Sequence, residues 1–339
     1  MNSVASARER SDVPSDALPI DELLGAGQPV VLRGLVSNWA LVQAGERSTT
    51  EAMACLRRYD SHRPVQYSYG APDIAGRVFY TDDFTAINCE VRRGSLDQLL
   101  QDITKHLDDE HPPTWYMASA PVDACLPGFR EANDLDLAAH GIHAPPRIWI
   151  GNRTIASAHY DALNNIACCA VGRRRFTLFP PEQIANLYPG PLEPTPGGQA
   201  VSMVDFANPD FQRYPRFREA LATAQSVELA PGDAVFIPSL WWHHVEGLDP
   251  FNVLLNYWWS SAPDYVPAPL SALYHALWTI RDRPEREKRA WREIFDYYVF
   301  GPAERAGEHL PEAARDVLGP MDEMRMRQLR AMLIERLNR

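Results

Sequence analysis

The chain has 339 residues, 45% of them apolar and 23% charged, as expected of a folded protein with a large hydrophobic core. Its formal net charge is −11, and its densest basic run is three arginines at 173–175, which argues against a surface for gripping nucleic-acid phosphates. Five cysteines without a C-x-x-C pair, and a chain without an apolar leader or a membrane-length apolar run, predict a cytoplasmic protein with reduced thiols.

The first 112 residues carry both strand and helix signals. Residues 29–36 (PVVLRGLV) form a short β-branched apolar run, which is typical of a strand. Residues 96–110 place leucine and isoleucine at helical spacing and therefore predict an amphipathic helix. We expect residues 1–112 to form an N-terminal α/β portion that packs on the part that follows.

Residues 113–263 change in character. Short apolar runs such as TWYMA, RIWIG and FNVLLNYWW alternate with turn signals at close spacing, which favours a β-sandwich or barrel over a βαβ fold. Residues 181–189 predict a helical turn or two between strands, and residues 189–198 form a loop rich in proline and glycine.

Residues 264–339 become helical in pattern. The last segment, residues 321–337, is predicted to be a helix with a broad apolar face. That face comprises Met321, Met324, Leu329, Met332, Leu333 and Leu337. It would either cap the chain's own β portion or pair with a second copy of the chain.

A histidine and an aspartate stand two positions apart in SAHYDALNNI, residues 157–166. Residues i and i+2 of a strand point to the same face, so His159 and Asp161 could hold one cation together. Taken alone, H-x-D occurs often by chance and does not distinguish a metal site from an ordinary polar strand.

Two further histidines, His243 and His244, follow two tryptophans in APGDAVFIPSLWWHHVEGL, residues 230–248. Two histidines and one carboxylate are the ligands of a mononuclear non-haem iron site, which leaves other positions open for a co-substrate and dioxygen. An isolated His-His pair would more often pack in an apolar corner. Together with the upstream H-x-D, the pattern favours an iron site formed by His159, Asp161 and His243.

The run HYDALNNIACCAVGRRRFTLFPPEQIANLYP, residues 159–189, resembles the JmjC/cupin-8 family of iron(II)- and 2-oxoglutarate-dependent oxygenases. That family's signature is H-x-D-x-x-x-N followed by G-x-K-R-F-x-L-F-P-P. The resemblance continues through SMVDFANPDFQRYPRF to NVLLNYWW and is closest in motif to the asparaginyl hydroxylase factor inhibiting HIF. It implies a mainly β fold with helical flanks, in which residues 113–263 form a double-stranded β-helix of the jelly-roll or cupin type.

Position by position, the resemblance assigns His159, Asp161 and His243 to the iron, with His244 as a neighbour. It implies a 2-oxoglutarate pocket formed by Asn165, Arg174, Asn256, Trp258 and, by a looser match, Tyr116. Tyr116 could equally be a half-buried strand tyrosine.

The sequence departs from the family in two places. Arg174 stands where the family has the lysine that pairs with the distal carboxylate of 2-oxoglutarate. Arginine can bind a carboxylate through two parallel N–H bonds, and strand alternation would turn Arg174 inward with Phe176. The alternative is a solvated Arg174 with another group on the carboxylate. Ala200 and Val201 replace the Arg-Gln pair that holds the target of the asparaginyl hydroxylase, which puts that reaction in doubt.

The resemblance implies hydroxylation of a substrate C–H bond with dioxygen and 2-oxoglutarate as co-substrates, and release of succinate and carbon dioxide. Two other classes stay open. A cupin isomerase or hydrolase with zinc or manganese would have little use for Asn165, Asn256 and Arg174, and a non-catalytic binding module would not need all three metal ligands.

The family acts on protein side chains, histone methyl-lysines and tRNA bases. The acidic composition favours a protein or peptide substrate here. Factor inhibiting HIF dimerises through C-terminal helices, so the resemblance also implies a homodimer formed through residues 321–337.

Overall fold

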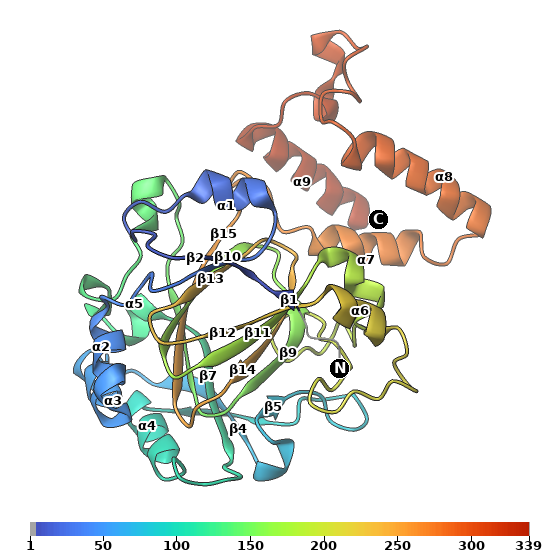
Figure 1. Ribbon diagram of the computed structural model, residues 1–339. Coiled ribbons are helices and arrows are strands. Elements are labelled where there is room, and N and C mark those ends of the chain that lie inside the picture. The colour runs from blue at the N-terminus through green and yellow to red at the C-terminus, as the bar shows by residue number, and fades with distance from the viewer. Residues whose placement is uncertain (1–4, 339) are drawn as a thin grey trace. The chain divides into compact units, whose positions relative to one another are not determined.

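The computed structural model describes residues 5–338 and divides into two compact units, one ending at Trp259 and the other beginning at Ser260. The first unit is built on two sheets and the second is helical (Figure 1). Within the described residues, no helix combines the length and apolar character needed to cross a bilayer. The domain boundaries expected after residues 112 and 263 remain predictions.

A six-stranded sheet forms one wall of the first unit. Its strands, in spatial order, are β1 (Ala5–Ser6), β12 (Gln225–Leu229), β11 (Arg174–Phe179), β14 (Trp242–Gly247), β9 (Ile155–Tyr160) and β5 (Arg77–Val78). β9 and β14 are antiparallel, with His243 opposite His159. Because directly paired residues of neighbouring strands project to the same face, this register places the two histidines side by side.

A nine-stranded sheet forms the second wall. Its strands, in spatial order, are β2 (Arg8–Arg10), β3 (Val30–Leu32), β13 (Ala234–Ile237), β10 (Asn164–Val171), β15 (Asn252–Trp259), β8 (Arg147–Gly151), β7 (Thr114–Pro121), β4 (Val65–Gly70) and β6 (Glu90–Gly94). The two sheets enclose an interior, as expected for a double-stranded β-helix. Four of the nine strands, β2, β3, β4 and β6, come from the first 112 residues, so the N-terminal portion extends this sheet.

Strand β10 shows how side chains are divided between the two faces of the large sheet. All eight of its residues are buried, because both faces are covered. Ala167 and Cys169 belong to the apolar cluster between the sheets, whereas Ile166 and Cys168 belong to the cluster on the outer face. Every second residue of a central strand therefore faces the interior where the site is expected.

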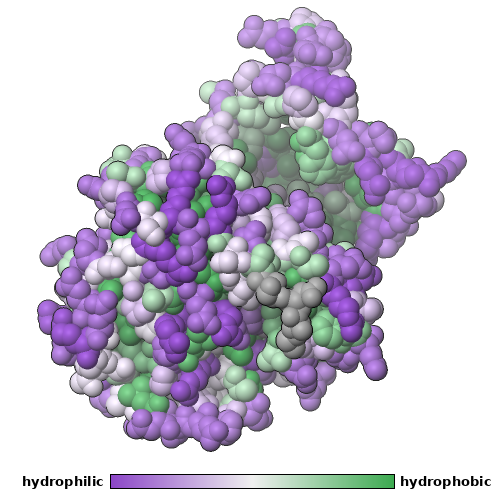
Figure 2. All heavy atoms as spheres, viewed as in Figure 1, coloured by the Kyte–Doolittle hydropathy of each residue, from purple (hydrophilic) through white to green (hydrophobic). Residues whose placement is uncertain are grey.

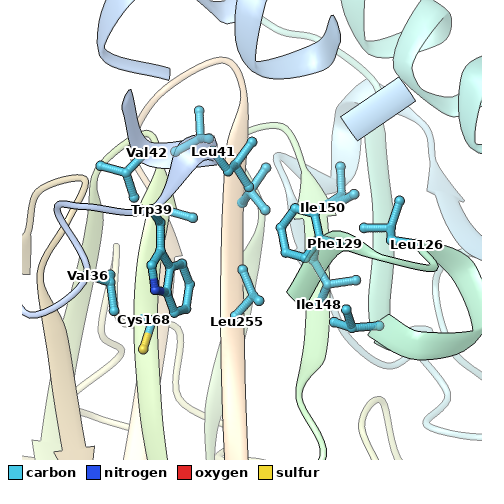
Figure 3. Packing of buried hydrophobic residues seen from close by; sticks show 14 of the residues in the cluster. Val36, Trp39, Leu41, Val42, Leu126, Phe129, Ile148, Ile150, Cys168 and Leu255 are labelled. Carbon is cyan, nitrogen blue, oxygen red and sulfur yellow. The ribbon is translucent and has the colours of Figure 1, made fainter. Parts of the chain in front are cut away.

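The outer face of the large sheet is covered by α2 (Ala40–Arg47), α3 (Thr49–Arg58) and α4 (Leu96–Thr104). Figure 3 shows Trp39 and Leu41 packed with Cys168 and Leu255 in this cluster. The helix predicted over residues 96–110 begins as expected, because Ser95 caps it by accepting from the Gln98 N–H. It ends earlier, at Thr104, before the polar run that leads to two prolines.

The remaining segments of the first unit are shorter. They include α1 (Ile20–Ala26), α5 (Val122–Cys125), α6 (Phe217–Thr223) and the 3-10 turns η1 (Pro72–Ile74), η2 (Phe129–Glu131), η3 (Leu137–His140) and η4 (Pro181–Ala185). The turn η4 confirms the one predicted over residues 181–189. The strand predicted over residues 29–36 shortens to β3, because Gly34 takes a left-handed φ of 68° and turns the chain away.

The second unit contains α7 (Leu270–Thr279), α8 (Glu285–Phe295), the π-helical turn η5 (Asp296–Phe300), the 3-10 turns η6 (Glu312–Ala314) and η7 (Asp316–Leu318), and α9 (Glu323–Leu337). None of these elements has a fully buried residue, and Figure 2 shows apolar residues gathered in the hollow of this unit. The apolar face predicted over residues 321–337 divides in two. Leu329 and Met332 are half-buried, whereas Met324, Leu333 and Leu337 are exposed.

Candidate metal centre

The structure brings together the three side chains that the sequence singled out. His159 lies near the end of β9, Asp161 in the turn that follows, and His243 opposite on β14. One ligand atom from each lies within 4.8 Å of the others, and His243 Nε2 is 3.6 Å from Asp161 Oδ2. Among residues 5–338 this is the only such group of three or more.

Backbone carbonyls orient both imidazoles. His159 Nδ1 lies 2.9 Å from the carbonyl oxygen of Ser157, and His243 Nδ1 lies 3.1 Å from that of Trp241. Because a carbonyl oxygen only accepts, each Nδ1 must carry the proton. In a neutral ring held this way, the free lone pair is on Nε2, which is the form of histidine that binds a metal.

The surroundings favour a bound cation. Burial, reinforced by His159, lowers the pKa of His243 to about 4 against the opposing effect of Asp161, so the imidazole is neutral at pH 7. Asp161 Oδ2 is buried and has no hydrogen-bond partner among the described residues. A buried carboxylate oxygen without a donor is costly unless a cation meets it. Two imidazoles and one carboxylate fit ferrous iron with open positions.

Contacts across the loop before β14 hold the turn that carries Asp161. The Leu240 N–H donates to the Asp161 carbonyl oxygen at 2.7 Å, and Ser239 Oγ donates to that of Ala162 at 3.0 Å. Leu240 has a φ of 67°, an uncommon value for a residue with a branched side chain. These contacts tie the Asp161 turn to the strand that carries His243.

His244 faces away from this cluster. It is buried on the outer side of the six-stranded sheet, where its ring stacks on Phe206 at a centroid distance of 4.3 Å and an interplanar angle of 21°. Burial is the main reason that its pKa falls to about 3, and Arg77 adds to the effect. Strand alternation therefore places His243 and His244 on opposite faces of the sheet, and the assignment of His243 rather than His244 to the iron stays a prediction.

Arg174 lies in the interior, with only 2% of its surface exposed. Its Nε and Nη2 have no hydrogen-bond partner among residues 5–338, whereas Arg173 pairs with Asp249 and Arg175 pairs with Glu228. The alternative of a solvated Arg174 is therefore wrong.

Tyr116 shares the interior with Arg174. Burial raises the pKa of the Tyr116 hydroxyl to about 12, although the positive charge of the nearby Arg174 acts in the opposite direction. Tyr116 is 9% exposed and thus buried rather than half-buried. Its hydroxyl and the Arg174 guanidinium are close enough to influence each other's pKa values.

The predicted asparagines contact each other. Asn256 Nδ2 donates to Asn165 Oδ1 at 2.7 Å, which leaves the buried Asn256 Oδ1 without a partner among the described residues. On the same strand, and on the same face as Asn256, the buried Trp258 Nε1 is also unpaired in this part of the chain.

Trp149 was missed by the sequence reasoning. Its buried Nε1 has no partner within residues 5–338, and its ring lies 5.9 Å from Trp258, edge to face, and 5.8 Å from Tyr116. Strand alternation in RIWIG would have predicted its position, because Ile148 and Ile150 point to the outer face of the sheet and Trp149 therefore points to the interior. The interior thus contains the indole N–H donors of Trp149 and Trp258, and the Arg174 cation, without hydrogen-bond partners for these atoms among the described residues.

Comparison with known proteins gives one family and several partial relatives. The family described as "Cupin-like domain" matches residues 15–265. Lysine-specific demethylase JMJ31 of Arabidopsis thaliana is 30% identical over 185 residues, covering 49% of this chain and 31% of that protein. The human HSPB1-associated protein 1 is 34% identical over 148 residues, covering 42% of this chain and 30% of that protein.

A third relative matches more of the chain. Lysine-specific demethylase 8 of Xenopus tropicalis is 24% identical over 255 residues, covering 71% of this chain and 50% of that protein. The chain thus spans between about a third and half of the length of these curated relatives.

Proposed function

Because the chain belongs to the cupin-like domain family, we propose that it is an iron(II)- and 2-oxoglutarate-dependent dioxygenase that hydroxylates a protein side chain. One observation carries the proposal. His159, Asp161 and His243 converge at the end of an interior that also buries a cation, Arg174, with no carboxylate partner among the described residues. A metal and a dicarboxylate would satisfy both features.

The three ligands would hold the iron through His159 Nε2, His243 Nε2 and a carboxylate oxygen of Asp161. Both Nδ1 atoms are already engaged with carbonyl oxygens, so each imidazole is oriented with Nε2 available to the metal. The orphaned Asp161 Oδ2 would gain the partner that it lacks.

Arg174 would bind the distal carboxylate of 2-oxoglutarate. Its Nε and Nη2 are the free edge of the guanidinium, and two parallel N–H bonds from it match a carboxylate. Tyr116 would orient the guanidinium, and the unpaired Trp149 and Trp258 Nε1 atoms could donate to the same bound molecule.

Iron and 2-oxoglutarate, when bound, would supply oxidative decarboxylation to succinate and carbon dioxide coupled to hydroxylation of a substrate C–H bond. The chain's part is to position these groups and to exclude water. Phe176, Leu178 and Val245 line the interior and are at most 8% exposed. No side chain is required as a general base.

The two other classes of protein account for fewer features of the interior than an oxygenase does. An isomerase or hydrolase that uses zinc or manganese would use the three metal ligands but would leave Arg174 buried and unpaired. A non-catalytic module would not need Asp161 Oδ2 to be buried without a hydrogen-bond donor.

We expect 2-oxoglutarate, added without oxygen to the iron(II)-loaded protein, to produce a weak visible metal-to-ligand charge-transfer band. The band requires a keto acid that chelates the iron, which neither rival class predicts. Visible difference spectroscopy measures it, with succinate as the control because succinate has no keto group. Absence of the band at saturating 2-oxoglutarate would rule out the proposed chemistry.

The residues that would contact the substrate differ from those of the asparaginyl hydroxylase. Ala200 and Val201, at 4% and 3% exposure, are buried where that enzyme has its Arg-Gln pair. We therefore propose a protein side chain other than an asparagine held by those contacts. The names of two relatives, both lysine-specific demethylases, are compatible with a protein substrate. We also propose a reducing, cytoplasmic setting, since all five cysteines are free.

A homodimer through the C-terminal unit is a further part of the proposal. In α9, Leu333, Ile334 and Leu337 are each about half exposed, which is unusual for neighbouring large apolar residues. We expect light scattering to report a dimer with an isologous interface for the full chain and a monomer for a chain ending near residue 305. A monomeric full-length protein at micromolar concentration would contradict the proposal.

A further inference from the structure

An open groove with a volume of about 600 Å³ lies outside the β-helix interior. Its walls come from the segment between η4 and α6, including Tyr188, Met203 and Tyr214, and from Phe84 in the turn between Tyr80 and Ile87. The groove thus belongs wholly to the first unit and shares no residue with the candidate metal centre.

Backbone hydrogen bonds connect the groove to the strand that carries His159. The Met203 N–H donates to the Tyr188 carbonyl oxygen at 2.9 Å, which joins two residues of the groove wall. The adjacent Ser202 N–H donates to the carbonyl oxygen of Ala158 at 2.7 Å. Ala158 precedes His159, so the groove wall is joined through the backbone to the strand that carries a metal ligand.

Two guanidinium groups line the groove. Arg216 Cζ lies 4.9 Å from the Tyr188 ring centre, and Arg213 Cζ lies 5.3 Å from that of Tyr214. Arg216 donates to the carbonyl oxygen of Ala185 at 2.9 Å. Within residues 5–338 neither arginine forms an ion pair, and the Arg213 guanidinium makes no hydrogen bond. Stacking on an aromatic ring leaves the N–H edge of a guanidinium available to a ligand.

No acidic side chain lines the groove. Asp83, next to Phe84 in the chain, is held within its own turn by the hydroxyls of Thr81 and Thr85. Two unpaired cations in a protein of net charge −11 form a local attraction for anionic groups that the rest of the composition does not provide.

We propose, on the basis of the function proposed above, that this groove docks an acidic segment of the protein substrate. Carboxylates of that segment pair with Arg213 and Arg216, while its apolar or proline residues lie on Phe84, Tyr188 and Tyr214. A nucleic acid fits less well, because two arginines do not make a phosphate-binding stripe and the chain as a whole repels a polyanion.

The test uses the full-length, metal-free protein and a fluorescein-labelled peptide of glutamates around a central Pro-Phe. Fluorescence anisotropy measures binding at low salt, with the matching glutamine peptide as a control. We expect the glutamate peptide to bind more tightly. Arg213→Gln and Arg216→Gln should each weaken its binding by roughly fivefold, which is the largest change expected from the loss of one exposed ion pair. Arg213→Gln is the cleaner variant, because it removes no hydrogen bond of the described fold.

Arg218→Gln is the matched control, since that arginine stacks on Phe211 at 4.0 Å and does not line the groove. Equal binding by wild type and the Arg213→Gln, Arg216→Gln double variant would overturn the proposal, and so would an equal loss in Arg218→Gln. Arginine-dependent binding of a single-stranded RNA in preference to the peptide would also overturn it. The assay contains no iron, so its outcome is independent of the charge-transfer test of the oxygenase.

Discussion

Alanine at His159, Asp161 or His243 is expected to abolish iron(II) binding by this protein, whereas His244→Ala should keep it. Each of the first three residues contributes one of the ligand atoms that lie within 4.8 Å of one another. Changes in the groups around a metal ligand already cost about ten- to a hundred-fold in affinity, so loss of the ligand itself should cost more than about a hundredfold.

The contrast between the two adjacent histidines makes this prediction specific. Both are buried, so either alanine variant could lose stability through the cavity that it leaves. His244, however, stacks on Phe206 on the other side of the sheet. Iron binding is measured by equilibrium dialysis, alongside a thermal melt that confirms folding. If folded His244→Ala lost iron while folded His243→Ala kept it, the ligand assignment would be wrong.

Arg174→Ala is expected to raise the apparent 2-oxoglutarate requirement by roughly ten- to a hundred-fold. This range corresponds to the about 1.5–3 kcal/mol of a charge-assisted hydrogen-bonded pair. Iron binding should persist, because Arg174 contributes no atom to the group of three ligands. The dependence of the charge-transfer band on 2-oxoglutarate concentration measures the effect directly and without turnover.

Neighbouring and conservative variants separate charge recognition from packing. Arg173→Ala and Arg175→Ala should change the 2-oxoglutarate requirement little, since both side chains pair with surface carboxylates. Arg174→Lys restores the residue type that the family resemblance leads one to expect, and should recover part of the loss because it keeps the cation. Unchanged 2-oxoglutarate dependence in Arg174→Ala would show that another group holds the carboxylate.

Much of the site could be predicted from local sequence because strand periodicity is a local property. Alternation along RRRFTLF correctly turned Arg174 inward and its two arginine neighbours outward. The same rule would have found Trp149, had it been applied to RIWIG. The short runs of residues 113–260 also predicted strands, and the mainly β fold on a double-stranded β-helix core is confirmed by the family match.

Other features depended on contacts between segments that lie far apart in the chain. H-x-D by itself did not distinguish a metal site from a polar strand. The pairing of His243 with His159, 84 positions earlier, adds the third side chain that the proposed metal site needs, and that register is set by whole strands packing between two apolar clusters. The absence of a donor for Asp161 Oδ2 and of a carboxylate for Arg174 among the described residues was likewise invisible in the sequence, because it depends on every neighbour.

The sequence by itself determined which side chains could bind a metal and a dicarboxylate, since residue type and strand alternation are fixed by the chain. Only the tertiary structure decided that these side chains share one buried interior, and that Arg213 and Arg216 meet aromatic rings in a separate groove. Pairing across long stretches of chain is set by the burial of many apolar side chains at once, a cooperative effect that no short motif contains.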